Sequence, residues 1–133
     1  DVGSTYIWNF NEGGFTYHGV NEVLVTFADT VANLGTSLIT ETINVAEASG
    51  LATQTADVIN FSQIYSGVGA IQFTVITNWD GDNFATDVYN TVTDSTQFTG
   101  LSEVRFNTVP EPSTYALLAG LSGLAFVMVR RRK

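Results

Sequence analysis

Residues 22–27 read EVLVTF, and apolar side chains recur at every second position as Val23, Val25 and Phe27. Alternate residues of an extended chain point to the same side, so these three side chains share one face. This period of two is typical of a β-strand that buries one face in a core. A helix would instead repeat its apolar positions about every 3.6 residues.

Other segments show strand patterns and are separated by turn-forming residues. Strands are expected at residues 6–10, 38–45, 57–61, 71–76 and 101–106, with turns at residues 11–14, 33–35, 49–50, 66–67 and 80–83. Trp8, in the middle of its strand, is expected in the core. The body is also rich in Thr, Val, Asn, Gly and aromatic residues, which half-buried strands and tight turns favour. We therefore expect an all-β domain over residues 1–107, a β-sandwich of the jelly-roll type.

Charge divides the chain into an acidic body and a basic end. Of the 13 Asp and Glu residues, all except Glu111 lie in residues 1–109, where Arg105 is the one Lys or Arg. Nucleic acid and anionic lipid need Lys and Arg to displace their counterions, so both are excluded as partners of the body. The chain has no cysteine, which excludes disulfides, thiolate zinc sites and a cysteine nucleophile. Sugars, metal ions and other proteins remain compatible partners.

The C-terminal residues form an uncharged run that ends in four cations. Residues 115–129 carry no charge, and the chain then ends in Arg130, Arg131, Arg132 and Lys133. A helix of this length spans about 22 Å, and snorkelling arginine stems extend its reach toward the roughly 30 Å of a hydrocarbon core. We expect a transmembrane helix with a basic tail at residues 114–133, joined to the body by a linker at residues 108–113. A buried amphipathic helix is the alternative, but the run is apolar on every face.

The linker and the apolar run together carry a resemblance to a known family. Val109, Pro110, Glu111 and Pro112, then the apolar run and terminal arginines, resemble the PEP-CTERM sorting signal of exported bacterial proteins. The resemblance implies that an exosortase in the inner membrane recognises the Pro-Glu-Pro motif and that Arg130–Lys133 are a stop-transfer cluster. It also implies a transient inner-membrane intermediate and delivery to the cell envelope, cell surface or exopolysaccharide matrix. The two prolines hold an extended backbone, which suits a protease-like cleft.

The body resembles a discoidin-like domain of the galactose-binding-like class. The motifs that carry this resemblance are IWNFNE at 7–12, GVNEV at 19–23, DVINF at 57–61, IQFTV at 71–75, NW at 78–79 and GLSEVRF at 100–106. The resemblance implies a non-catalytic module that binds carbohydrate, lipid head groups or protein through loops at one end. Such domains have two or more strands before the tryptophan strand, and here only residues 1–5 precede it. Either the fold is N-terminally truncated or it is a shortened variant.

Two groups of loop residues are candidate binding sites. Trp79, Phe84 and Tyr89 are aromatic residues that can stack on the apolar faces of the sugars in a surface glycan. Asp80, Asp82 and Asp87 supply the hard oxygen ligands that calcium prefers. Their spacing is not that of an EF-hand, and an ordinary Asp-Gly turn without a metal ion is the alternative.

Catalytic residues are not evident, so we expect no enzymatic activity. His18 is the one histidine, and no Gly-x-Ser-x-Gly motif supplies a nucleophile for it. We expect His18 on a surface strand and Glu103 on a solvated face, paired with Arg105. A structural matrix or filament component is the alternative function, because strands that lack lysine at sheet edges can pair between copies.

Overall fold

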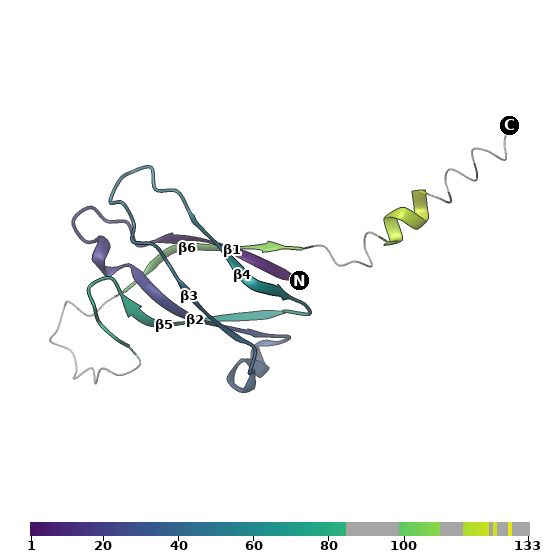
Figure 1. The fold of residues 1–133 in the computed structure, drawn as a ribbon, viewed down its shortest axis with the longest axis horizontal. Coiled ribbons are helices and arrows are strands. Elements are labelled where there is room, and N and C mark those ends of the chain that lie inside the picture. Colours follow the sequence, from purple (N-terminus) through teal and green to yellow (C-terminus); the bar gives the residue numbers. More distant parts are fainter. Residues whose placement is uncertain (85–98, 110–115, 123, 125–127, 129–133) are drawn as a thin grey trace.

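The structure, a computed structural model, describes residues 1–84, 99–109, 116–122, 124 and 128. Within these residues, six strands form two antiparallel three-stranded sheets that face each other (Figure 1). The strands are β1 (Val2–Asn9), β2 (Val20–Ala28), β3 (Thr40–Asn44), β4 (Asp57–Tyr65), β5 (Ala70–Asn78) and β6 (Leu101–Thr108). This arrangement confirms the expected all-β body with two packed sheets.

Strands that are distant in the sequence are neighbours in each sheet. One sheet has the order β4-β1-β6 and the other has the order β3-β2-β5. Ile7 of β1 lies opposite both Asp57 of β4 and Val104 of β6. Val25 of β2 lies between Glu41 and Phe73 in the same way. The two strands that come first in the chain therefore occupy the centres of different sheets.

The core lies between the two sheets and follows the alternation of β2. Val23, Val25 and Phe27 are completely buried, as the sequence predicted. Phe27 contacts the opposite sheet through the ring of Phe61, whose centroid is 5.0 Å away in an edge-to-face arrangement. On the side where β5 faces β6, half-buried aromatic rings of Phe73 and Phe106 lie 5.9 Å apart and cover the core.

Trp8 is not a core residue, so that expectation is wrong. Its neighbours Ile7 and Asn9 are buried, and the alternation of β1 turns Trp8 to the outer face of the sheet, where it is half-buried. The guanidinium carbon of Arg105 lies 5.2 Å from the centroid of the Trp8 ring, a cation–π contact. The same guanidinium donates to Glu103 at 2.6 Å, which confirms the expected pairing on a solvated face.

The apolar C-terminal run is helical over residues 116–122, which lie apart from the sandwich (Figure 1). Leu117, Leu118 and Leu121 are each more than half exposed. Within the described part of the chain, no helix has the length and apolarity needed to cross a membrane. Most of the segment for which we predicted a span, including its cationic end, lies outside the described residues, so the span stays a prediction.

Candidate functional site

The sandwich has two distinct ends, which lie at opposite ends of β1. Val2 is opposite Thr108 of β6, and the amide of Val109 donates to the carbonyl of Asp1 at 3.0 Å, so the C-terminal segment leaves from this end. Asn9 lies about 23 Å further along the strand, given a rise of about 3.3 Å per residue. We call the end at Val109 the tail end and the end at Asn9 the loop end.

Trp79 lies at the loop end and is held there by two hydrogen bonds. Its backbone amide donates to the carbonyl of Gly19 at 3.1 Å, and its indole Nε1 donates to the carbonyl of Val45 at 3.1 Å. The residue is still 40% exposed. The predicted aromatic side chain is therefore fixed in orientation while part of its surface stays open to solvent.

Asp82 belongs to a closed turn after β5. Its amide donates to Oδ1 of Asn78 and its carboxylate accepts from Nδ2 of Asn78, both at 2.8 Å, while Gly81 supplies the positive φ of 97° that the turn requires. Asp80 is exposed next to it. Asp87 lies outside the described residues, and among the residues with described positions no group of three His, Asp or Glu could hold a metal ion. The calcium site stays a prediction.

Phe84 and Tyr89 are the other two aromatic residues that were predicted to contact a sugar. Phe84 is half-buried, and its amide donates to the carbonyl of Ile76 at 2.7 Å, which keeps it beside the end of β5. Tyr89 lies outside the described residues. Of the three aromatic candidates, Trp79 is therefore the one placed as an exposed side chain at the loop end.

His18 is buried, and the expectation of a surface strand is wrong. It ends the 3-10 helix η1 (Thr16–His18), which follows a turn in which the amide of Phe15 donates to the carbonyl of Glu12. The 3-10 helix directs the imidazole inward. His18 is 4% exposed, and its ring centroid lies 4.3 Å from that of Tyr17. The His18 carbonyl accepts from the amide of Gly100, which ties η1 to the start of β6.

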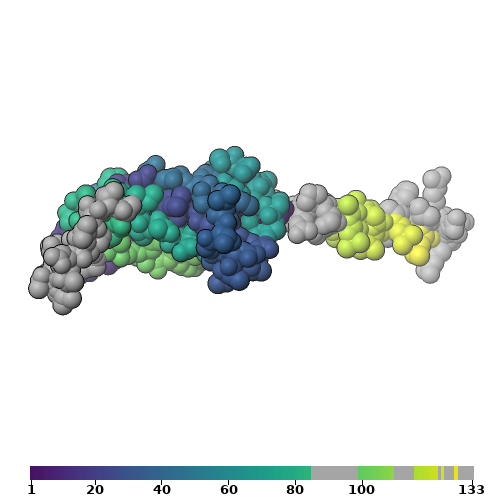
Figure 2. All heavy atoms as spheres, turned by 90° about the horizontal axis from the view of Figure 1, so that it is seen from below, coloured from purple at the N-terminus to yellow at the C-terminus, as the bar shows by residue number. Residues whose placement is uncertain are grey.

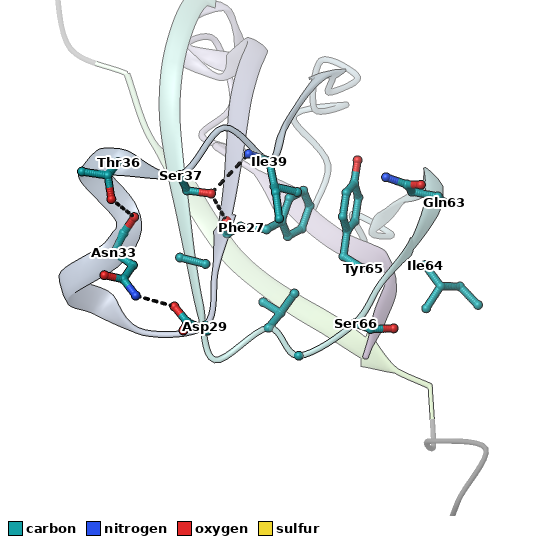
Figure 3. A pocket seen from close by; sticks show the side chains of 13 residues that line it. Phe27, Asp29, Asn33, Thr36, Ser37, Ile39, Gln63, Ile64, Tyr65 and Ser66 are labelled. Carbon is teal, nitrogen blue, oxygen red and sulfur yellow. Dashed lines mark hydrogen bonds between the residues drawn. The ribbon is translucent and has the colours of Figure 1, made fainter.

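A cavity of about 580 Å³ opens at the tail end, and sequence reasoning did not identify it (Figure 3). Its walls come from the end of β2, the 3-10 helix η2 (Val31–Thr36), the segment before β3, the end of β4 and the β4–β5 turn. The rings of Phe27 and Tyr65 stack beneath it, 4.0 Å apart and at 17° to each other. No local motif marks this cavity, because its walls come from segments about 25 to 40 residues apart.

The polar side chains on the η2 side of the cavity already have hydrogen-bond partners within residues 27–36. Asn33 donates to the carboxylate of Asp29 at 2.8 Å, and this hydrogen bond holds the pKa of Asp29 below its ordinary value. The hydroxyl of Thr36 donates to the carbonyl of Asn33 at 3.3 Å, and the hydroxyl of Ser37 donates to the carbonyl of Phe27. These bonds fix the shape of the loop that forms one wall.

The exposed side chains that line the cavity are the aliphatic Ile39 and Ile64 and the polar Asp29, Asn33, Thr36, Gln63 and Ser66. Phe27 is completely buried and Tyr65 is 7% exposed, so neither ring offers a face for stacking on a ligand. Ile39 and Ile64, which flank the cavity, are 52% and 55% exposed. A ligand or surface at this end would therefore meet branched aliphatic and polar side chains rather than an aromatic platform.

A comparison with protein-family models gives one match, to a family described as the PEP-CTERM protein-sorting motif, over residues 108–133. No curated protein and no solved structure matches the chain, so no match confirms the discoidin-like resemblance of the body. Pro110, Glu111, Pro112 and Arg130–Lys133 fall within the matched range, although they lie outside the described residues. The chain therefore carries a PEP-CTERM protein-sorting motif in residues 108–133, directly after the last strand of an acidic β-sandwich.

Proposed function

We propose that this chain is an exported bacterial surface or matrix protein that an exosortase sorts, and that its body is a non-catalytic module that binds a glycan or a protein. PEP-CTERM signals are recognised by exosortases, so the motif supports export and processing at the membrane. In this proposal residues 1–107 bind, residues 108–113 are the recognised linker, and residues 114–133 anchor the chain transiently. β6 ends at Thr108, so the last residue of the strand is the first residue of the proposed linker. The two packed sheets are compatible with a jelly-roll, discoidin-like body.

The position of Trp79 is the observation that carries the binding role. The tail leaves at Val109, so a chain anchored through its tail presents the loop end, with Trp79, away from the membrane. Aromatic rings stack on the apolar faces of sugars, and a ring that is already held by hydrogen bonds loses little conformational entropy on binding. A surface glycan, such as the exopolysaccharide of the producing cell, is therefore the proposed ligand.

Retention of the full chain, in detergent, on columns of immobilised exopolysaccharide tests this role. Trp79→Ala should weaken binding about tenfold, which corresponds to about 1.4 kcal/mol. Trp79→Phe loses the hydrogen bond to Val45. It should still retain most of the affinity, because it keeps an aromatic ring that can stack on the sugar. Trp8→Ala is the matched control, because Trp8 lies on the outer face of β1, where its ring contacts Arg105. Equal losses from Trp79→Ala and Trp8→Ala, or no loss from either, would contradict the proposal.

Processing of the tail tests the sorting role independently. Replacing Pro110 and Pro112 by alanine, or Glu111 by glutamine, should leave the unprocessed chain in the inner membrane, as should deletion of the exosortase. Normal processing of both variants would show that Pro-Glu-Pro is not the recognised element. Immunoblotting of membrane and extracellular fractions gives the readout.

A structural matrix component is the second candidate, and the sheet edges favour it. Among the residues that the structure describes, β3, β4, β5 and β6 lie at the edges of the two sheets, and Arg105 is the one Lys or Arg in these four strands. Lysine at sheet edges discourages pairing between molecules, so these edges are open to self-association. Light scattering over a range of protein concentrations distinguishes the two candidates. A monomer that binds glycan supports the module, and concentration-dependent filaments support the matrix component.

A further inference from the structure

We propose that the tail end of the sandwich docks on the surface of an uncharged lipid bilayer through Val31, Leu38, Ile39 and Ile64. We call these four residues the tail-end patch. The inference rests on the sorting half of the proposed function, which brings the chain to the membrane, and adds a contact between the body and the lipid. It does not depend on the glycan-binding role of Trp79.

The four side chains of the tail-end patch are strongly exposed. Leu38 is 94% exposed and Val31 is 76% exposed, while Ile39 and Ile64 are each slightly more than half exposed. Single exposed apolar residues are common in soluble proteins, but a group around one cavity marks an interaction site. Ile39 and Ile64 line the cavity themselves, and Leu38 and Val31 are next to or within the loop that forms its wall.

One member of the tail-end patch, Ile64, lies close to the point at which the sorting segment leaves the body. A Cβ atom placed on Gly3 would lie 3.7 Å from the side chain of Ile64 and 3.3 Å from that of Val109. Ile64 and Val109 therefore flank the same residue of β1. In Figure 1, β6 leaves the sandwich on the side where the N-terminus lies, and Figure 2 shows the dark blue segment around η2 projecting from the surface near the teal β4 and β5.

The length of the linker keeps the tail-end patch close to any membrane that holds the tail. From Val109 to Ala116, the first residue of the described helix, there are seven residue steps (109 to 116). A fully extended chain of that length spans at most about 24 Å. When the apolar segment lies in a bilayer, Val109 stays within that distance of Ala116, so the tail end of the sandwich is held near the membrane. A tethered site of this kind has an effective concentration of about millimolar, so weak affinity is sufficient.

The chemistry of this end favours lipid over the other partners. Asp29 is the one charged side chain among the residues that line the cavity, and Arg105 is the one Lys or Arg in the described residues. An acidic body of this kind is repelled by anionic lipid, so the bilayer surface must be uncharged. The buried rings of Phe27 and Tyr65 cannot stack on a sugar. Branched aliphatic side chains suit the boundary between headgroups and acyl chains.

The absence of cysteine from the sequence makes a clean labelling experiment possible. The Leu38→Cys variant of the full chain is labelled at the new cysteine with an environment-sensitive dye. The labelled chain is reconstituted in phosphatidylcholine vesicles that contain a nitroxide-labelled lipid. The matched control is Leu51→Cys, because Leu51 is 64% exposed and its carbonyl accepts from Asn11 at the loop end. We expect the lipid quencher to reduce the Leu38 signal at least threefold more than the Leu51 signal. Aqueous iodide should quench the dye at position 51 more strongly than the dye at position 38.

A second variant separates docking from simple tethering. Ile39→Asp with Ile64→Asp, made in the Leu38→Cys chain, should abolish the difference in lipid quenching. Both side chains are more than half exposed, so the fold, checked by circular dichroism, should be retained. Unchanged quenching in this variant overturns the proposal.

The remaining outcomes also decide the question. Equal quenching at Leu38 and Leu51 overturns the docking, while the sorting and the glycan binding of the proposed function stand. If the protection of the dye at position 38 from iodide increases with the ratio of protein to lipid, a second copy of the chain covers the patch, and the docking on lipid is overturned. A chain that does not float with the vesicles at all overturns both the docking and the membrane step of the proposed function.

Discussion

The side chain of Asn9 and the backbone of Val20 form a reciprocal pair of hydrogen bonds that joins β1 to β2. Asn9 Nδ2 donates to the Val20 carbonyl at 2.7 Å, and the Val20 amide donates to Asn9 Oδ1 at 2.8 Å. Nδ2 also donates to the carbonyl of Ala46, and Oδ1 also accepts from the amide of Phe10. Since β1 and β2 are central strands of opposite sheets, this buried carboxamide connects the two layers at the loop end.

Asn9→Asp should destabilise the fold strongly. A carboxylate cannot donate to the carbonyls of Val20 and Ala46, and it would place a charge at a position that is 2% exposed. We expect the free energy of unfolding to fall by about 3 kcal/mol or more. Urea denaturation followed by tryptophan fluorescence measures this change. Asn60→Asp, at an exposed position of β4, is the control and should change stability little. Similar losses in both variants would contradict the role of Asn9.

Gly69→Ala should prevent normal packing of the β4–β5 turn. A Cβ atom there would clash with the carbonyl oxygen of Asp29, and the Gly69 amide already donates to the carbonyl of Ala28. Backbone must move to relieve the clash, so we expect a loss of about 3 kcal/mol, measured by thermal unfolding. Gly35→Ala is the matched control, because no atom lies within 4 Å of its added Cβ. A stable Gly69→Ala variant would mean that the turn can shift freely.

Tyr65→Phe should loosen the contact between the edge strands β3 and β4. The Tyr65 hydroxyl donates to Glu41 at 2.8 Å, and Glu41 also accepts from the amide and hydroxyl of Ser62. Loss of one hydrogen bond in this half-buried cluster should lower the free energy of unfolding by about 1 kcal/mol. Tyr6→Phe, on the outer face of β1, provides the comparison in the same denaturation experiment. An equal effect at Tyr6 would argue against a specific link through Glu41.

The hydrogen bond from Asn33 to Asp29 should make the wall of the cavity sensitive to acid. It holds the folded-state pKa of Asp29 below the unperturbed value of 3.8, so the stabilisation is present above that value and is lost as pH falls through the folded pKa. Asn33→Ala should therefore raise the Asp29 pKa in an NMR titration. It should also lower the melting temperature slightly at neutral pH, and this effect should disappear as pH falls below the folded-state pKa of Asp29, where the carboxyl is protonated in both states. An unchanged titration midpoint would refute this cause.

The sequence by itself determined the features that depend on neighbouring residues. The alternation of Val23, Val25 and Phe27 predicted a strand with one buried face, because pleating repeats every two residues whatever surrounds it. The sorting motif was recognised because Pro110, Glu111 and Pro112, the apolar run and the terminal cations are contiguous. The position of Trp79 after a strand indicated an exposed aromatic side chain at a loop.

Only the tertiary structure decided which face of a strand is inside and which distant segments meet. Ile7 and Trp8 are both apolar and adjacent, so periodicity could not show that Ile7 is buried and Trp8 lies outside. His18 is buried because the η1 turn packs against the start of β6, about 80 residues later. The cavity and the tail-end patch arise where β2, η2 and β4 come together, and Ile64 and Val109 flank Gly3 only because β4 and β6 both pair with β1. Such contacts depend on long-range packing, which a local sequence pattern does not encode.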